Sequence, residues 1–256
     1  MTPARPKLPQ SALAQADSRE REPRLERLRA AAHAANVKLP ATGLVTLTWG
    51  NASAIDRELG LVAIKPSGVP YEVLTVNDIV LVDLDGAVVQ GSGRPSTDTP
   101  THLALYRAFA TIGGVVHTHS TWATAWAQAE REIPLLGTTH ADLSAHPIPL
   151  TRALTAQEIE RDYEAATGRV LVESISGFGP EEQPCALVRQ HGPFCWGPDV
   201  DSALSTAVTL EEVARLATLT EMLGPRGDTL DAALLRKHYE RKHGPSAYYG
   251  QPPEAH

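Results

Sequence analysis

The sequence has little cysteine and no long apolar run. Two cysteines occur in 256 residues, Cys185 and Cys195, and neither belongs to a C-x-x-C pair. This excludes a disulfide framework and favours a reducing, cytoplasmic compartment. No apolar stretch approaches the roughly 18 residues that span a bilayer. The first residues also lack the apolar core of a secretory signal, so we expect a cytoplasmic protein without membrane contact.

An excess of basic charge is also missing. The chain carries 23 Lys and Arg against 30 Asp and Glu, a formal net charge of −7. That balance argues against non-specific binding to nucleic acid or to an anionic membrane surface, although a local basic pocket for one small anion remains allowed.

What is present indicates one folded domain. With 42% hydrophobic residues, 256 residues are enough to close a sizeable core. Residues 1–23 are rich in Pro, Ala and charge and have no apolar period, so we expect a mobile N-terminal extension followed by a single domain over 24–256.

The pattern of strands and helices predicts an α/β fold. Helical spacing over 25–37 is followed by interleaved strand and helix candidates, with Asp85-Gly86 as a hairpin turn. We expect a single domain whose central mixed, largely antiparallel sheet is covered by helices on both faces. The predicted strands are 44–48, 61–64, 79–82, 87–89, 114–119, 170–173 and 186–189, and the later helices are 100–109, 121–129, 155–166, 200–223 and 230–241.

His117-Thr118-His119 is the first chemically informative motif. Residues i and i+2 of a strand point to the same face, with Cα atoms about 7 Å apart, so two imidazoles can share one metal ion. The competing interpretation is two ordinary histidines at the end of a strand. His191 follows a second strand candidate, and Asp98 lies in a polar loop before a helix. Three imidazoles and one carboxylate suit a divalent ion of the zinc type, and no H-E-x-x-H motif competes with them.

Small polar loops follow several strand candidates. Gly50-Asn51, Lys65-Pro66-Ser67-Gly68 and Ser96-Thr97 offer backbone N–H groups, hydroxyls and a cation to a phosphate. Each loop alone is most often a plain turn. There is no G-x-x-x-x-G-K-[ST] motif, which argues against a nucleoside triphosphate.

Two further segments carry titratable groups. Thr138-Thr139-His140-Ala141-Asp142 is read as a loop that could do acid/base work, although a solvated loop is the favoured interpretation from spacing alone. Tyr248-Tyr249 near the C-terminus would ordinarily pack on a neighbouring surface.

Together these motifs resemble the epimerase branch of the class II aldolase/epimerase family. The resemblance runs from about residue 25 to Gln251 and is carried by LVTLTWGNASAID, IKPSGVPYE, RPSTDTPTHLALY, GGVVHTHS, GTTHAD, HGPFCWG and LLRKHYERKHGPSAYYGQ. It implies the three-layer fold of the class II aldolases.

The resemblance also implies roles for individual residues. Asp98, His117, His119 and His191 would hold one Zn²⁺ per subunit, with Mn²⁺ or Co²⁺ as possible substitutes. Asp142 and Tyr249 would be the acid/base pair, with Tyr249 reaching into the active site of an adjacent subunit of a homotetramer. The substrate, mainly its phosphate, would be bound by Gly50, Asn51, Lys65, Ser67, Gly68, Ser96, Thr97 and His238.

The activity that the resemblance implies is the interconversion of L-ribulose 5-phosphate and D-xylulose 5-phosphate. Inversion at C4 would proceed by retro-aldol cleavage and aldol addition, because the C4 proton is not adjacent to the carbonyl. Burial and the metal would have to tune the pKa values of Asp142 and Tyr249 for work near neutral pH. The alternatives are a zinc-dependent sugar-phosphate aldolase that releases its products, and a non-catalytic aldolase-like binding module. Arabinose use and ascorbate-type breakdown both stay open as pathways.

Overall fold

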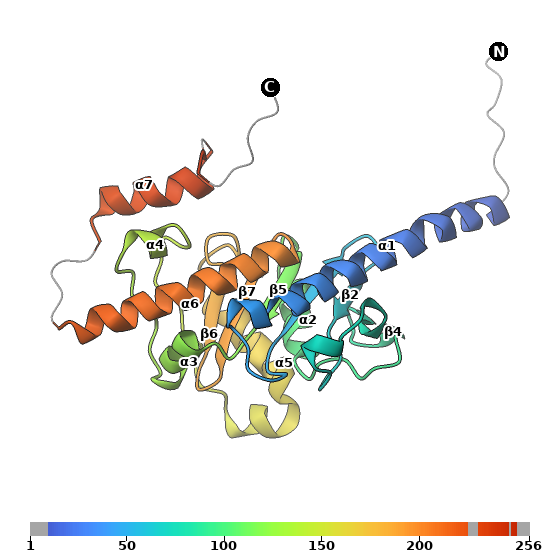
Figure 1. Ribbon diagram of the computed structural model, residues 1–256, viewed down its shortest axis with the longest axis horizontal. Helices are drawn as coiled ribbons and strands as arrows, with labels where there is room; N and C mark the ends of the chain where they lie inside the picture. The colour runs from blue at the N-terminus through green and yellow to red at the C-terminus, as the bar shows by residue number, and fades with distance from the viewer. Residues whose placement is uncertain (1–9, 225–229, 246, 250–256) are drawn as a thin grey trace, which may run out of the picture.

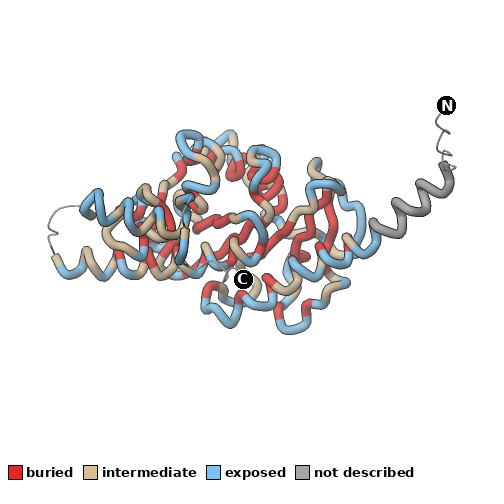
Figure 2. The backbone as a smooth tube through the Cα atoms, turned by 90° about the horizontal axis from the view of Figure 1, so that it is seen from above, coloured by how far each residue is buried: buried red, intermediate tan, exposed pale blue. Residues whose placement is uncertain are grey.

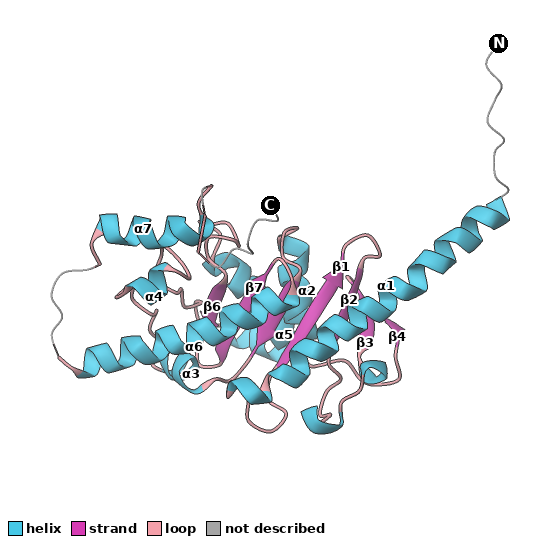
Figure 3. Cartoon of the chain, turned by 45° about the horizontal axis from the view of Figure 1, so that its top comes forward, coloured by secondary structure: helices cyan, strands magenta, loops and turns pink. Residues whose placement is uncertain are grey.

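A seven-stranded sheet in the order β4-β3-β2-β1-β5-β7-β6 runs through the middle of the protein. In the computed structural model, the described residues are 10–224, 230–245 and 247–249, and side chains are described from residue 21 onward. Figure 3 shows the strands lying behind the long helices α1 and α6. The strands are β1 (Asn51–Asp56), β2 (Leu61–Ile64), β3 (Val80–Asp83), β4 (Val88–Gln90), β5 (Gly114–His117), β6 (Cys185–Val188) and β7 (Gly192–Gly197).

Helices cover both faces of this sheet (Figure 1). The short 3₁₀ turns η1 (Pro40–Thr42), η2 (Tyr71–Val73) and η3 (Val76–Asp78) lie in the connections. The α-helices are α1 (Gln10–Lys38), α2 (Thr99–Ala108), α3 (Thr121–Gln128), α4 (Thr138–Ala141), α5 (Ala156–Ser174), α6 (Val200–Met222) and α7 (Ala232–His243).

Two apolar cores, one on each face of the sheet, hold the three layers together. Figure 2 shows the buried residues along the interior segments of the chain. Adjacent strand residues point to opposite faces, so Val116 packs under α1, α3 and α6 while Val115 packs under α2 and α5. In β3, Leu81 likewise belongs to the core on the first face and Val80 to the core on the second. Both sides of the sheet are therefore apolar and need a helical cover.

The fold class is as predicted, a single domain with helices on both faces. Every ladder between neighbouring strands is antiparallel, and parallel pairing among the described residues is limited to the isolated bridge between Leu150 and Leu187. Among the described residues, no helix has the length and apolarity of a bilayer-spanning segment.

Two predicted strands are wrong. Residues 44–48 form a loop, closed by a backbone hydrogen bond from the Trp49 N–H to the Thr46 carbonyl, and the strand begins only at Asn51. Residues 170–173 continue α5, because the capping box of Thr155 and Glu158 starts a helix whose apolar face extends to Leu171. In both cases a β-branched run was outweighed by its tertiary or helical context.

Apart from the 3₁₀ turns, three elements were not predicted, and the first is β1, since no strand was expected over Asn51–Asp56. Gly192 and Pro193, which follow the predicted strand 186–189 and were assigned to no strand, begin β7, which pairs with both β5 and β6. Residues 138–142 were read as a loop, yet 138–141 form the single-turn helix α4. The helix α1 also begins earlier than expected, at Gln10, so that Pro23 lies inside it. Residues 1–9 lie outside the described residues, and the mobility expected for 1–23 stays a prediction.

Candidate metal and substrate site

A cavity of about 680 Å³ opens where the ends of β1, β2 and β5 meet the β6–β7 turn. It collects every predicted metal ligand and every predicted substrate-binding residue except His238. Its lining comprises Thr48, Trp49, Gly50, Asn51, Lys65, Pro66, Ser67, Gly68, Ser96, Thr97, Asp98, His117, His119, Tyr163, Glu164 and His191.

Three imidazoles converge in this cavity. The ring centroids of His117, His119 and His191 lie 4.8 to 5.0 Å apart, and one nitrogen from each lies within 4.8 Å of the other two. His117 ends β5 and His119 follows it, as the H-x-H spacing predicts. His191 is brought in by the tight β6–β7 turn, in which its N–H bonds to the Val188 carbonyl.

The hydrogen bonding of His117 makes it suitable as a metal ligand. Its Nδ1 lies 2.9 Å from the carbonyl oxygen of Pro193, which can only accept. Nδ1 therefore carries a proton and Nε2 is the nitrogen left for a metal, the arrangement typical of a metal-bound histidine. Burial and the neighbouring His117 and His119 lower the pKa of His191 to about 3, so this ring is neutral at pH 7 and also able to coordinate.

Asp98 lies in the same cavity in a network of its own. Asn51 donates through Nδ2 to Asp98 Oδ2 at 2.7 Å and to Ser96 Oγ at 3.1 Å. Burial alone would raise the pKa of Asp98, but the neighbouring imidazoles of His117 and His102 and the Asn51 hydrogen bond lower it below its usual value. Among the described residues, the closely spaced candidate ligand atoms belong to His117, His119 and His191 and do not include Asp98. The role of Asp98 as a fourth ligand therefore stays a prediction.

The donor set fits a divalent ion. Three imidazoles with free nitrogens and an adjacent carboxylate are the ligands that zinc-type ions prefer. The buried Oδ1 of Asn51 has no hydrogen-bond partner among the described residues, which leaves an acceptor in the cavity for a bound ligand or water.

Two loops form the opposite wall. The Ser67 N–H donates to the Arg94 carbonyl and the Ser96 N–H to the Lys65 carbonyl, so the loops after β2 and before α2 are held together. The side chain of Lys65 is only 2% exposed, and burial lowers the pKa of its ammonium group. Its Nζ lies 4.9 Å from the centre of the Tyr71 ring. A cation held in this way can attract an anionic group to the wall.

Gly50 permits the close approach of the loop to β5. Its φ of +115° is one that side chains rarely adopt. A Cβ at this position would lie 2.9 Å from the carbonyl oxygen of His117 and 2.8 Å from Val45 Cγ1. Glycine is therefore required where the cavity floor meets the strand that carries His117.

The remaining predicted residues gather elsewhere, on α7 and in the segments that follow α4 and α7. Asp142, next to α4, accepts hydrogen bonds from Arg241 at 2.6 and 3.0 Å, and His238 Nδ1 lies 3.2 Å from the same carboxylate. The Arg241 guanidinium lies 4.4 Å from the centre of the Tyr249 ring. We call Asp142, His238, Arg241 and Tyr249 the α7 cluster. None of its members lines the histidine cavity.

The electrostatics of Asp142 differ from the expectation. Burial would raise the pKa of its carboxyl, but the hydrogen bonds from Arg241 and His238 outweigh burial and lower it. Within one chain the pKa of this group therefore moves away from neutrality.

Sequence reasoning missed Tyr163 and Glu164 as cavity residues. The segment was read as an uninterrupted helix, but the backbone leaves helical geometry at Asp162, with φ −165° and ψ 66°. The residues after this break enter the cavity, and the Tyr163 hydroxyl lies 2.9 Å from His191 Nδ1. No pattern in the sequence signals the break, since neither Gly nor Pro occurs there.

Comparison with known proteins gives a consistent picture. The family model described as Class II Aldolase and Adducin N-terminal domain matches residues 30–218. A protein of Salmonella paratyphi B named L-ribulose-5-phosphate 4-epimerase UlaF is 55% identical over 227 residues, which are 89% of this chain and all of that protein. The protein of the same name from Salmonella typhi matches at the same identity and coverage.

Solved structures agree on the fold. An L-fuculose 1-phosphate aldolase superposes with a TM-score of 0.73 at 24% identity, over 84% of this chain and 95% of that one. The l-fuculose-1-phosphate aldolase of Thermus thermophilus gives a TM-score of 0.62 at 24% identity, over 79% of this chain and the whole of the other.

Proposed function

Because the chain belongs to the class II aldolase and adducin family, we propose that it is a metal-dependent epimerase that interconverts L-ribulose 5-phosphate and D-xylulose 5-phosphate. The observation that carries the proposal is the 55% identity, over their full length, with the two Salmonella proteins named L-ribulose-5-phosphate 4-epimerase UlaF. The histidine cavity supports it, because it combines a candidate metal site with loops suited to a phosphate.

The metal we propose is Zn²⁺, held by His117, His119 and His191 with Asp98 as a fourth ligand, and replaceable by Mn²⁺ or Co²⁺. When bound, it supplies a Lewis acid for the carbonyl end of the sugar. The residues of the protein supply the remaining parts of the reaction.

Substrate binding falls to the two loops opposite the histidines. Ser67, Gly68, Ser96 and Thr97 would hold the phosphate with their hydroxyls and N–H groups, and buried Lys65 would add positive charge. Gly50 and Asn51 would contact the sugar from the cavity floor. A substrate held at both ends can break its C3–C4 bond, let the aldehyde turn, and re-form the bond on the other face of the carbonyl.

Two proton carriers are then required at the C4 oxygen. One takes the hydroxyl proton as the C3–C4 bond breaks, and the other returns a proton as the bond re-forms on the opposite face. We assign these roles to Asp142 and Tyr249, with His238 binding the substrate beside them. Since the α7 cluster does not line the cavity of its own chain, a second copy would supply it, which fits a homotetramer with active sites between subunits.

The two alternatives make different predictions for the same assay. An aldolase would release free aldehyde, and a binding module would convert nothing. The presence of three converging imidazoles counts against the binding module. The cytoplasmic location and the sugar-phosphate substrate also belong to this proposal, and either arabinose use or ascorbate-type breakdown would employ the reaction.

The test is incubation of the purified protein with L-ribulose 5-phosphate. We expect D-xylulose 5-phosphate to form, to stop forming after treatment with a chelator, and to form again when Zn²⁺ is restored. Stoichiometric trapping of glycolaldehyde phosphate would instead identify an aldolase. If protein that contains metal fails to convert L-ribulose 5-phosphate, the proposal is overturned.

A further inference from the structure

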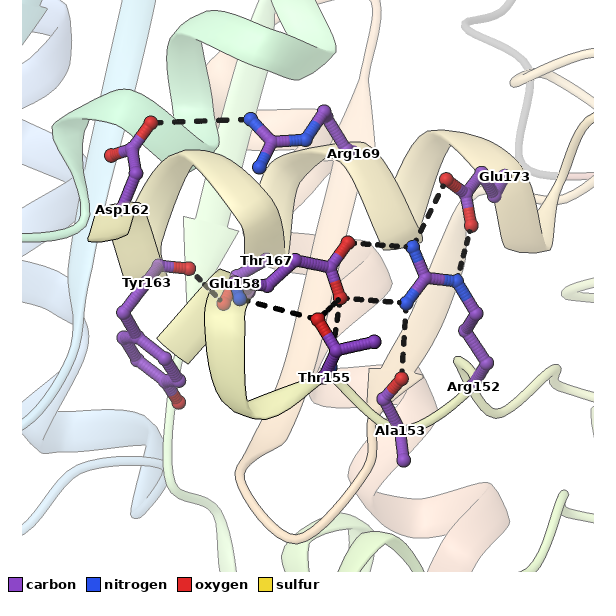
Figure 4. Close-up of polar contacts among 9 residues, drawn as sticks. All are labelled: Arg152, Ala153, Thr155, Glu158, Asp162, Tyr163, Thr167, Arg169 and Glu173. Atoms are coloured by element: carbon purple, nitrogen blue, oxygen red, sulfur yellow. Dashed lines mark hydrogen bonds and ion pairs between the residues drawn. The ribbon is translucent and has the colours of Figure 1, made fainter. Parts of the chain in front are cut away.

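The break in α5 at Asp162 places one tyrosine against the histidine cavity. The first part of the helix is held by the capping box of Thr155 and Glu158, and Arg152 bonds to both Glu158 and Glu173 (Figure 4). In that view the Tyr163 side chain points away from the Arg152 network. The anchored first turns and the break after them determine where Tyr163 lies.

The second part of α5 is fixed against α2. Thr101 Oγ1 donates to the Glu164 carbonyl at 2.7 Å, and a Cβ on Gly168 would lie 2.4 Å from Ala104 Cβ. Thr167 Oγ1 in turn donates to the Tyr163 carbonyl at 2.8 Å. The backbone of Tyr163 is thus held on both sides of the break, so its side chain has a defined position.

The Tyr163 hydroxyl lies 2.9 Å from Nδ1 of His191, and the two rings are nearly parallel at 21°, with centroids 6.1 Å apart. A phenol can donate or accept. If His191 is to offer Nε2 to a metal, its Nδ1 must carry the proton, and the tyrosine oxygen must then be the acceptor. The Pro193 carbonyl does the same for His117.

We propose that Tyr163 is a positioning residue for the metal site: its oxygen accepts the His191 Nδ1–H, holds the ring with Nε2 toward His117 and His119, and leaves its own hydroxyl hydrogen for a ligand in the cavity. The proposal rests on the metal site of the proposed function. Tyr163 would thus fix the tautomer of His191 and would also donate a hydrogen bond to a molecule bound in the cavity.

The experiment compares metal affinity in Tyr163→Phe and the unaltered protein. The dissociation constants for Zn²⁺ and Co²⁺ are measured by competition with a chelator, without any substrate. Loss of a hydrogen-bond partner of a ligating histidine typically weakens metal binding about 10- to 100-fold. We expect a loss of that size, together with a changed visible absorption spectrum of the Co²⁺-loaded protein.

Tyr106→Phe is the matched control. Tyr106 is a fully buried tyrosine whose hydroxyl bonds to Ser53 rather than to a histidine. This variant should lose thermal stability but keep the metal affinity and the Co²⁺ spectrum. A merely structural role for Tyr163 would give the same pattern as the control.

The outcomes separate this proposal from the proposed function. Unchanged affinity and spectrum in Tyr163→Phe, with tight binding by the unaltered protein, would overturn the role of Tyr163 alone. Absence of metal binding by the unaltered protein would overturn both. Tight binding without epimerase activity would overturn the proposed function and leave the role of Tyr163 supported by the affinity data.

Discussion

The histidine cavity and the α7 cluster are built in opposite ways. The cavity takes its residues from strand ends and from loops tied together by backbone hydrogen bonds, at the centre of the sheet. The α7 cluster joins Asp142, which follows the single-turn helix α4, and Tyr249, which lies beyond α7, to two residues of α7, a helix with no buried described residue. Side-chain bonds to Asp142 hold it together.

This difference suggests that the two regions have different functions, metal binding in the cavity and proton transfer in the α7 cluster. A metal site must hold its ligands to within a few tenths of an ångström, which a sheet can do. Under the proposed assembly, proton carriers from a second subunit would need a surface element that can project into a neighbour. We therefore expect substitutions of the three cavity histidines to affect metal binding and substitutions of Asp142 or Tyr249 to affect turnover alone.

The largest effects should come from His119→Ala and Asp142→Asn. His119→Ala removes one of three imidazoles, and we expect loss of metal and at least a roughly 10³-fold fall in activity, because the Lewis acid is lost. Asp142→Asn should lower kcat about 10²-fold or more while the metal content stays unchanged. Metal analysis and steady-state kinetics on both proteins measure the contrast, and metal loss from Asp142→Asn would contradict it.

Co-expression of these two variants sharpens the contrast. If each site joins the histidines of one copy to Asp142 of the next, randomly mixed rings contain some intact sites and should regain up to about a quarter of the normal activity. Each variant alone is the control. Mixed oligomers that remain inactive would mean that both halves of the site come from the same chain.

The pH dependence of kcat/KM should change in the variant Arg241→Met. Arg241 holds the pKa of Asp142 below its usual value against the opposing effect of burial, so removing the guanidinium raises that pKa. A larger fraction of Asp142 is then protonated in mildly acidic solution, and the acidic limb of kcat/KM should move to higher pH. Arg215→Met, which removes a pair with Glu212 on α6, should leave the limb in place. An unmoved limb in Arg241→Met would exclude Asp142 as the titrating base.

The smallest effect should come from the cap of α7. The Asp231 carboxylate accepts from the N–H groups of Ala233 and Leu234, and loss of such a cap costs about 1 kcal/mol of helix stability. Because α7 has no buried described residue, Asp231→Ala should lower kcat a few-fold with little change in the melting temperature. Asp199→Ala, at the cap of α6, one face of which is buried in the core, should instead lower the melting temperature. A large drop in melting temperature for Asp231→Ala would show that α7 belongs to the main core.

The sequence was sufficient for the fold class and for much of the cavity lining, but not for Tyr163 and Glu164. The H-x-H spacing predicted that His117 and His119 meet, and loops after strand candidates predicted the opposite wall. These inferences succeeded because strand periodicity is a local property.

The errors at β1 and β7 arose where long-range pairing decided the structure. Asn51 begins a strand because it pairs with His117, and Gly192 and Pro193 lie in a strand because they pair with β6. Local propensity argues against a strand at all three positions. The helix break that brings in Tyr163 has no local signal either, so its contact with His191 could be found only from the structure.

The Pro193 carbonyl that orients His117 has a consequence for how this site can evolve. A main-chain oxygen cannot be removed by any single amino-acid replacement, so the orientation of His117 is robust to point mutation at the position that holds it. The orientation of His191 depends on a side chain that one codon change can delete. Drift in metal preference among relatives should therefore be found at position 163 sooner than at position 193.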